Sequence, residues 1–94
     1  MTDYVLILHE VADYDAWKLV FDEAAGIRKA AGEISYQLLC HETSPKLIVH
    51  MSHWSSLKDA RGFFESSALE AIRQRAGVKA PKFIYLNELE QATL

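Results

Sequence analysis

An α+β fold of ferredoxin-like type is predicted by three features of the 94-residue sequence. Apolar runs of strand length cover residues 3–11, 33–41, 46–54 and 82–90. Two longer stretches carry apolar residues at helical spacing, and a short polar connection joins the two middle strands. With right-handed crossovers, the order βαββαβ gives a four-stranded antiparallel sheet with both helices on one face. We expect one domain spanning residues 1–94.

The first helix is predicted over residues 13–31, directly after the first strand. Asp13 is a natural N-cap, because its carboxylate can accept hydrogen bonds from the free amides of the first turn. Gly32 is expected to end the helix. The apolar residues between them recur at three- and four-residue spacing and should form one buried stripe: Trp17, Val20, Phe21, Ala24, Ile27 and Ala31.

The second helical stretch, residues 56–77, is predicted to be broken rather than continuous. Ser56 with Asp59, and Ser67 with Glu70, both have the spacing of a capping box, so two helices should begin within it. The second and third strands should form a hairpin, because the segment between them is polar and contains proline.

Charge and cysteine content exclude several classes of protein. The formal net charge is −3 and the sequence pI about 5.7, which disfavours nucleic acid and anionic membranes as partners. Cys40 is the single cysteine, so we expect neither a disulfide framework nor a cysteine metal site. The sequence has no signal-peptide pattern and no apolar run long enough to span a membrane, and we therefore expect a cytoplasmic protein.

A sheet covered by helices on one face leaves its other face open, and a second copy of the chain is the simplest cover. We therefore expect a homodimer. On the third strand, the residues predicted to face the helices are Leu47, Val49 and Met51, and those predicted to face the cavity are Ile48, His50, Ser52 and Trp54. On the second strand, the corresponding sets are Ile34, Tyr36, Leu38 and Cys40 against Ser35, Gln37, Leu39 and His41.

A family resemblance extends over almost the whole chain. It is carried by His9, Asp13-Tyr14, Trp17, Phe21-Asp22, Arg28, Gly32, Pro45, Trp54, Ala60-Arg61, Phe63 or Phe64, Ala76-Gly77-Val78 and Pro81. With these residues the chain resembles the dimeric α+β barrel superfamily, in particular the small antibiotic biosynthesis monooxygenase-like domains. The resemblance implies the fold and a homodimer. It does not imply one activity, because the scaffold carries cofactor-free oxygenases, haem-degrading enzymes and isomerases.

A catalytic site is predicted around His9, Trp54 and Tyr14. The first and third strands are expected to be parallel neighbours, which would bring His9 and Trp54 to the same rim, with Tyr14 at the start of the adjoining helix. A histidine can remove a proton from a phenol or enol, and an indole N–H can stabilise the resulting oxyanion. In the alternative interpretation, His9 bonds Asp13 and Trp54 fills the core.

Four further residues are predicted to bind a substrate in the cavity: Gln37, His50, Ser52 and Asn87. No metal site is expected, because His50 and His53 are three residues apart on a strand and point to opposite faces. The related haem-binding proteins use a histidine on the second helix, and the segment 69–77 has none. We therefore expect no cofactor.

Two arginines that match the family pattern, Arg28 and Arg61, are expected to pair with Asp22 and Glu65 at helical distances, or to lie in a subunit contact. The predicted function is a cofactor-independent monooxygenase, or a related proton-transfer enzyme, acting on a small aromatic or polyketide-like molecule. The alternative is a homodimer that binds a small hydrophobic or aromatic ligand, or has a structural role, without catalysis.

Overall fold

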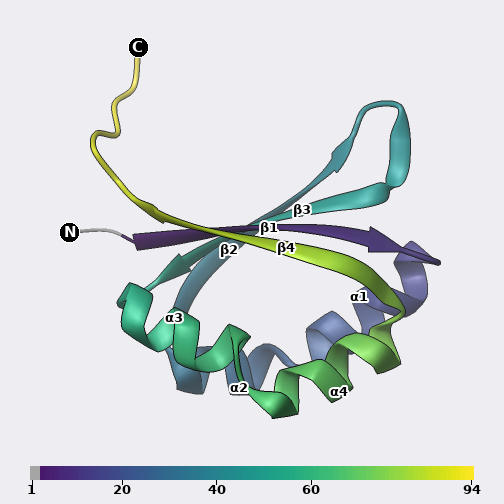
Figure 1. Cartoon of the computed structure of the whole chain (residues 1–94). Coiled ribbons are helices and arrows are strands. Elements are labelled where there is room, and N and C mark those ends of the chain that lie inside the picture. Colours follow the sequence, from purple (N-terminus) through teal and green to yellow (C-terminus); the bar gives the residue numbers. More distant parts are fainter. Residues whose placement is uncertain (1–2) are drawn as a thin grey trace.

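The four strands form one antiparallel sheet in the order β2-β3-β1-β4, and the helices all lie on one of its faces (Figure 1). The computed structural model describes residues 3–94, apart from the side chains of residues 79 and 80. The strands are β1 (Asp3–Val11), β2 (Glu33–His41), β3 (Ser44–Trp54) and β4 (Val78–Asn87). The helices are α1 (Tyr14–Glu23), α2 (Ala25–Ala31), α3 (Leu57–Phe64) and α4 (Ser67–Ala76). The predicted ferredoxin-like fold is confirmed.

Side-chain caps begin three of these helices. The Asp13 carboxylate accepts from the backbone N–H of Ala16 at 2.9 Å and begins α1. The second helical stretch is broken as predicted, and Ser56 caps α3. Ser66, one residue before the predicted position, caps α4. None of the helices described within residues 3–94 is long and apolar enough to cross a membrane.

Three elements differ from the prediction in their boundaries. β3 begins at Ser44, two residues before the predicted start, so Pro45 lies in the strand and not in the connection. The helix predicted over 13–31 is divided at Ala24 into α1 and α2, where Gly26 lowers the helical propensity of the sequence. The last strand begins at Val78 and ends at Asn87, so that it contains Pro81. This position is tolerated because β4 is an edge strand and needs backbone donors on one side only.

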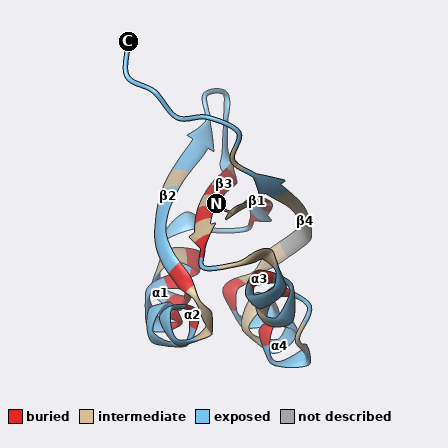
Figure 2. Ribbon diagram, turned by 90° about the vertical axis from the view of Figure 1, so that its left-hand side faces the viewer, coloured by how far each residue is buried: buried red, intermediate tan, exposed pale blue. Residues whose placement is uncertain are grey.

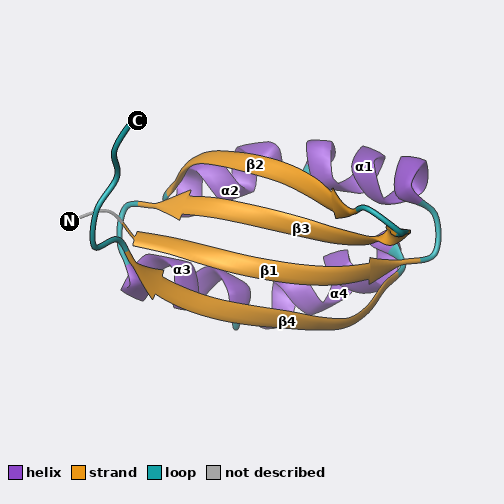
Figure 3. Cartoon of the chain, turned by 90° about the horizontal axis from the view of Figure 1, so that it is seen from above, coloured by secondary structure: helices purple, strands orange, loops and turns teal. Residues whose placement is uncertain are grey.

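The predicted parallel arrangement of the first and third strands is wrong. β1 and β3 are antiparallel neighbours (Figure 3). Asp3 lies opposite Trp54, and His9 lies opposite Ile48. Six residues of extended chain separate Asp3 from His9, which corresponds to about 20 Å along the strand. His9 and Trp54 therefore lie toward opposite ends of the sheet.

The faces predicted for β3 are also reversed. The buried residues of β3, which lie toward the helices, are Ile48, His50, Ser52 and Trp54. Figure 2 colours the buried residues of the chain red. On β2 the prediction holds for Tyr36, whose ring contacts Phe21 of α1, and for Leu38, which packs against the core. The pairing of β2 with β3 shifts between Glu33 and Ser35. This bulge places Glu33 on the same face as Tyr36, although their odd spacing would separate them in a regular strand.

Two apolar clusters fill the space between the sheet and the helices. One contains Val5, Ile7, Trp54, Ala60, Phe64 and Leu69. The other contains Val11, Trp17, Val20, Phe21, Ile48 and Ala76. His9 follows Ile7 and precedes Val11 on the buried face of β1, so this histidine lies between the two clusters.

Candidate functional site

A cavity of about 60 Å³ lies between the sheet and the helices. Its wall is largely apolar and is contributed by side chains of both clusters. Its charged or titratable lining residues are His9, Arg28, His50 and Arg73. The His9 and His50 rings come from neighbouring strands, and their centroids are 6.4 Å apart.

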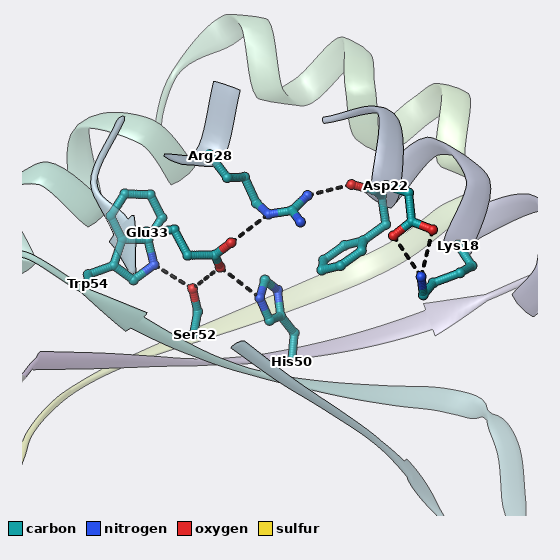
Figure 4. Close-up of polar contacts among 8 residues, drawn as sticks. Lys18, Asp22, Arg28, Glu33, His50, Ser52 and Trp54 are labelled. Carbon is teal, nitrogen blue, oxygen red and sulfur yellow. Dashed lines mark hydrogen bonds and ion pairs between the residues drawn. The ribbon is translucent and has the colours of Figure 1, made fainter. Parts of the chain in front are cut away.

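Around Glu33, the buried polar groups form a connected network, which we call the Glu33 network: Arg28, Glu33, His50, Ser52 and Trp54 (Figure 4). Arg28 Nε donates to Glu33 Oε1 at 2.7 Å, and His50 Nε2 donates to Glu33 Oε2 at 3.0 Å. The Ser52 hydroxyl also donates to Glu33, and it accepts from the Trp54 indole N–H. Both oxygens of this carboxylate therefore have donors.

The network determines the protonation of its members. Burial alone would raise the pKa of Glu33, but the hydrogen bonds from His50, Ser52 and Arg28 lower it overall, so Glu33 is a carboxylate. Burial lowers the pKa of His50 although Glu33 opposes this shift, so His50 is neutral. Because a carboxylate only accepts, the proton of neutral His50 is on Nε2. Its Nδ1 is an acceptor without a hydrogen-bond partner among the described residues.

His9 is in a contrasting environment. It is 7% exposed, and both of its ring nitrogens are buried without a hydrogen-bond partner in the described part of the chain. Burial, with smaller contributions from His50 and Arg73, lowers its pKa from 6.5 to about 3. Its contacts are aromatic: the Trp17 ring centroid is 5.5 Å away. His9 is therefore neutral, with one unused donor and one unused acceptor beside the cavity.

Solved structures similar to this chain were found at a probability of 1.00. One, from Bordetella bronchiseptica, is provisionally assigned as an antibiotic biosynthesis monooxygenase; it has a TM-score of 0.77 and 11% identity and covers 95% of this chain and 98% of its own. Another with the same provisional assignment, from Caulobacter crescentus CB15, has a TM-score of 0.73 and 21% identity over 95% and 91% of the chains. SnoaB, a cofactor-independent oxygenase from Streptomyces nogalater, has a TM-score of 0.74 and 11% identity over 96% and 94%.

The chain has the antibiotic biosynthesis monooxygenase-like fold. At these identities the likeness concerns the fold and not the activity. The chain matches no protein-family model, and a search of curated proteins found no match.

In this antibiotic biosynthesis monooxygenase-like fold, the predicted site residues do not all meet. His9 and His50 line the cavity, and Ser52 supports His50 through Glu33. Trp54 belongs to the same network, but its N–H is engaged by Ser52. Tyr14 is 40% exposed at the start of α1 and is not part of the cavity wall.

The other two predicted binding residues lie elsewhere. Gln37 is exposed and pairs with Met51, whose side lies away from the helices. Asn87 is exposed at the end of β4, opposite Asp3. Across the described part of the chain, no three His, Cys, Asp or Glu side chains are grouped to hold a metal ion.

Three functional candidates were missed or misplaced by the sequence analysis. Arg28 was expected to pair with Asp22, but it is buried and pairs with Glu33, while Lys18 binds Asp22 at 2.6 Å. Glu33 belongs to no motif in the sequence, and its position directly after Gly32 was the single feature that could have drawn attention to it. Arg73 was not considered, because its helix was assessed only for a haem-binding histidine, which it lacks. The pairing of Arg61 with Glu65, at 3.8 Å, agrees with the prediction.

Proposed function

We propose that the protein is a cofactor-independent oxygenase, or a related proton-transfer enzyme, in which His50 is the general base. The observation that carries this proposal is the Glu33–His50 hydrogen bond at the wall of a largely apolar cavity. Glu33 orients the imidazole, selects its tautomer and would stabilise the imidazolium formed when Nδ1 accepts a proton. SnoaB, which shares the fold, supports the class of chemistry.

His9 has a different role in this proposal from the one expected from the sequence. An imidazole with a pKa of about 3 is a poor acceptor of a full proton at neutral pH. Its two unpartnered nitrogens instead suit a hydrogen bond to a substrate oxygen. Trp54 contributes indirectly, because it holds Ser52 and thereby the carboxylate that orients His50.

The reaction needs a substrate that can be an electron donor after deprotonation. His50 would remove a phenolic or enolic proton, and the resulting anion would reduce O₂ and combine with it to give a hydroperoxide. Loss of water from that intermediate leaves a carbonyl group and returns the proton from His50. For a hydroquinone the balance is C₆H₆O₂ + O₂ → C₆H₄O₃ + H₂O, so the substrate supplies all the electrons.

The cavity favours a substrate smaller than a polyketide. A cavity of about 150 Å³ in an apolar protein interior takes up benzene, and the cavity here is about 60 Å³. A molecule with one ring, of which the cavity encloses only a part, therefore fits better than one with three fused rings.

We also propose that the protein is a homodimer formed through the open face of the sheet. Alternate residues of its two central strands make that face apolar: Leu6, Leu8, Leu47, Val49 and Met51. The helices lie on the other face of the sheet (Figure 1). Burial of such a face against a second copy adds apolar contact at roughly 25 cal/mol per Å². Light scattering should then give twice the chain mass of 10.7 kDa.

Oxygen uptake with hydroquinone, without added flavin or metal, tests the proposed activity. The parent protein should consume O₂, and His50→Gln should lower the rate about 100-fold or more, which is the usual contribution of a general base. His41→Gln is the matched control, because His41 is exposed in the hairpin. Binding of hydroquinone without O₂ uptake would support the alternative function, a non-catalytic binding protein.

A further inference from the structure

The lining of the cavity includes one arginine that is in no ion pair within the described residues. Arg28 is balanced by Glu33, with which it forms a buried ion pair. His9 and His50 are both neutral. Arg73 is the remaining charged lining residue, and it has no ion pair within the described residues.

Arg73 is held at this wall by α4 and β4. Its guanidinium carbon is 5.2 Å from the centroid of the Phe83 ring, and the side chain is partly buried. Arg73 also lines a second, more open hollow, together with Glu70 and Gln74. Glu70 lines that second hollow but does not line the cavity.

We propose that Arg73 and His9 form an anion-binding subsite, and that the substrate carries a carboxylate in addition to the hydroxyl that His50 deprotonates. This inference rests on the proposed function, because it assigns a substrate class to the same cavity. A carboxylate could accept from the Arg73 guanidinium and from the free N–H of His9 together. A substrate that enters with one negative charge would balance the positive charge of Arg73, whereas one that enters with two would leave an excess negative charge in the cavity.

Two probes, 2,5-dihydroxybenzoate and hydroquinone, have the same dihydroxy ring and differ only in the carboxylate. A comparison of their affinities therefore gives the contribution of the carboxylate to binding. Calorimetric titration at low ionic strength should show that the parent protein binds the acid roughly tenfold or more tightly, since hydrogen bonds between charged groups are the strong ones. Arg73→Gln should lower the affinity for the acid much more than the affinity for hydroquinone, so that the preference for the acid is lost. Arg73→Lys, which keeps the charge, should retain part of it.

The matched control is Arg75→Gln, on the same helix and with the same change of charge. Arg75 is 61% exposed in its side chain, pairs with Glu23 at 3.4 Å and does not line the cavity. It should leave both affinities unchanged. Thermal melting of each variant confirms that the chain is folded.

Three results would overturn the inference: equal binding of both probes by the parent, equal loss of acid binding in the Arg73 and Arg75 variants, or no binding of the acid at millimolar concentration. The oxygenase proposal is tested separately by O₂ uptake. A preference for the acid that depends on Arg73 but comes without uptake would support the subsite and contradict the oxygenase. O₂ uptake with hydroquinone but no preference for the acid would support the oxygenase and contradict the subsite.

Discussion

The Glu33 network lies at one end of the polar cavity lining and His9 at the other, and the two differ in how many of their polar atoms have a hydrogen-bond partner. In the Glu33 network the carboxylate accepts from three side chains, and Trp54 completes the chain of donors. At the other end, both nitrogens of His9 lack a partner among the described residues. Buried polar groups are usually satisfied, because each unsatisfied group is destabilising. The satisfied end therefore holds the site in shape, and the unsatisfied end is where a ligand would supply the missing groups.

Local backbone geometry creates the satisfied end. Gly32 ends α2 with φ 128°, a conformation that L side chains rarely adopt, and an added Cβ would lie 2.5 Å from Ser55 Oγ. The bulge that follows turns Glu33 toward the helices. Without these two features, alternation along β2 would place Glu33 with Ser35 on the open face.

The largest effect is expected for Glu33→Gln. This change leaves Arg28, which is 4% exposed, without a counter-charge. Removal of one partner of a buried pair lowers the free energy of unfolding by about 3 to 5 kcal/mol. Urea denaturation at pH 7 measures the loss. Glu65→Gln is the control, because its pair with Arg61 is exposed and contributes at most about 1 kcal/mol.

The acid response of the parent sharpens this test. The pKa of Glu33 is below its ordinary value of 4.5, so its contribution to stability is fully present above pH 4.5 and is lost as the pH falls through the folded-state pKa. Glu33→Gln should remove that part of the pH dependence. An unchanged acid limb would mean that the network does not stabilise the fold.

Ser52→Ala should have an intermediate effect. The change leaves the buried Trp54 N–H without an acceptor and removes one of the donors to Glu33, which lowers stability by about 1 to 3 kcal/mol. Ser55→Ala is the control, because its hydroxyl bonds Asp59 at an exposed position and its loss should change stability by less than about 0.5 kcal/mol. Equal midpoints for the two variants would contradict a network that depends on Ser52.

The sequence predicted the fold because its signals are local. Asp13 and Ser56 mark helix starts, and the hydrophobic periodicity identifies the strands. The site could not be predicted to the same extent, because both alternating sets of β3 contain apolar residues and periodicity alone cannot assign them to a face. The deciding partner for His50 is Glu33, 17 residues earlier, and it reaches the buried face through a bulge that has no pattern in the sequence.

The smallest change at neutral pH is expected for His9→Leu, which replaces an unsatisfied imidazole by an apolar side chain. At pH 7 the side chain at position 9 is uncharged in the parent and in the variant. Removal of unpartnered polar atoms should therefore leave the free energy of unfolding almost unchanged or raise it. A loss of several kcal/mol at pH 7 would mean that His9 has a structural partner. Chemical denaturation at pH 7 therefore decides between a ligand-binding and a structural role.

At lower pH the same variant should become more stable than the parent. The unfolded parent takes up a proton at His9 below pH 6.5, whereas the folded parent does so only near pH 3, so its stability falls as the pH decreases between these values. From pH 6.5 to pH 5 this amounts to about 2 kcal/mol. The parent also loses stability there through the lowered pKa of His50, which the variant retains, so the difference between the two proteins isolates His9. If the free energy of unfolding depends on pH in the same way in the parent and in His9→Leu, His9 is solvated in solution. The difference in hydrogen bonding between His9 and the Glu33 network would then be contradicted.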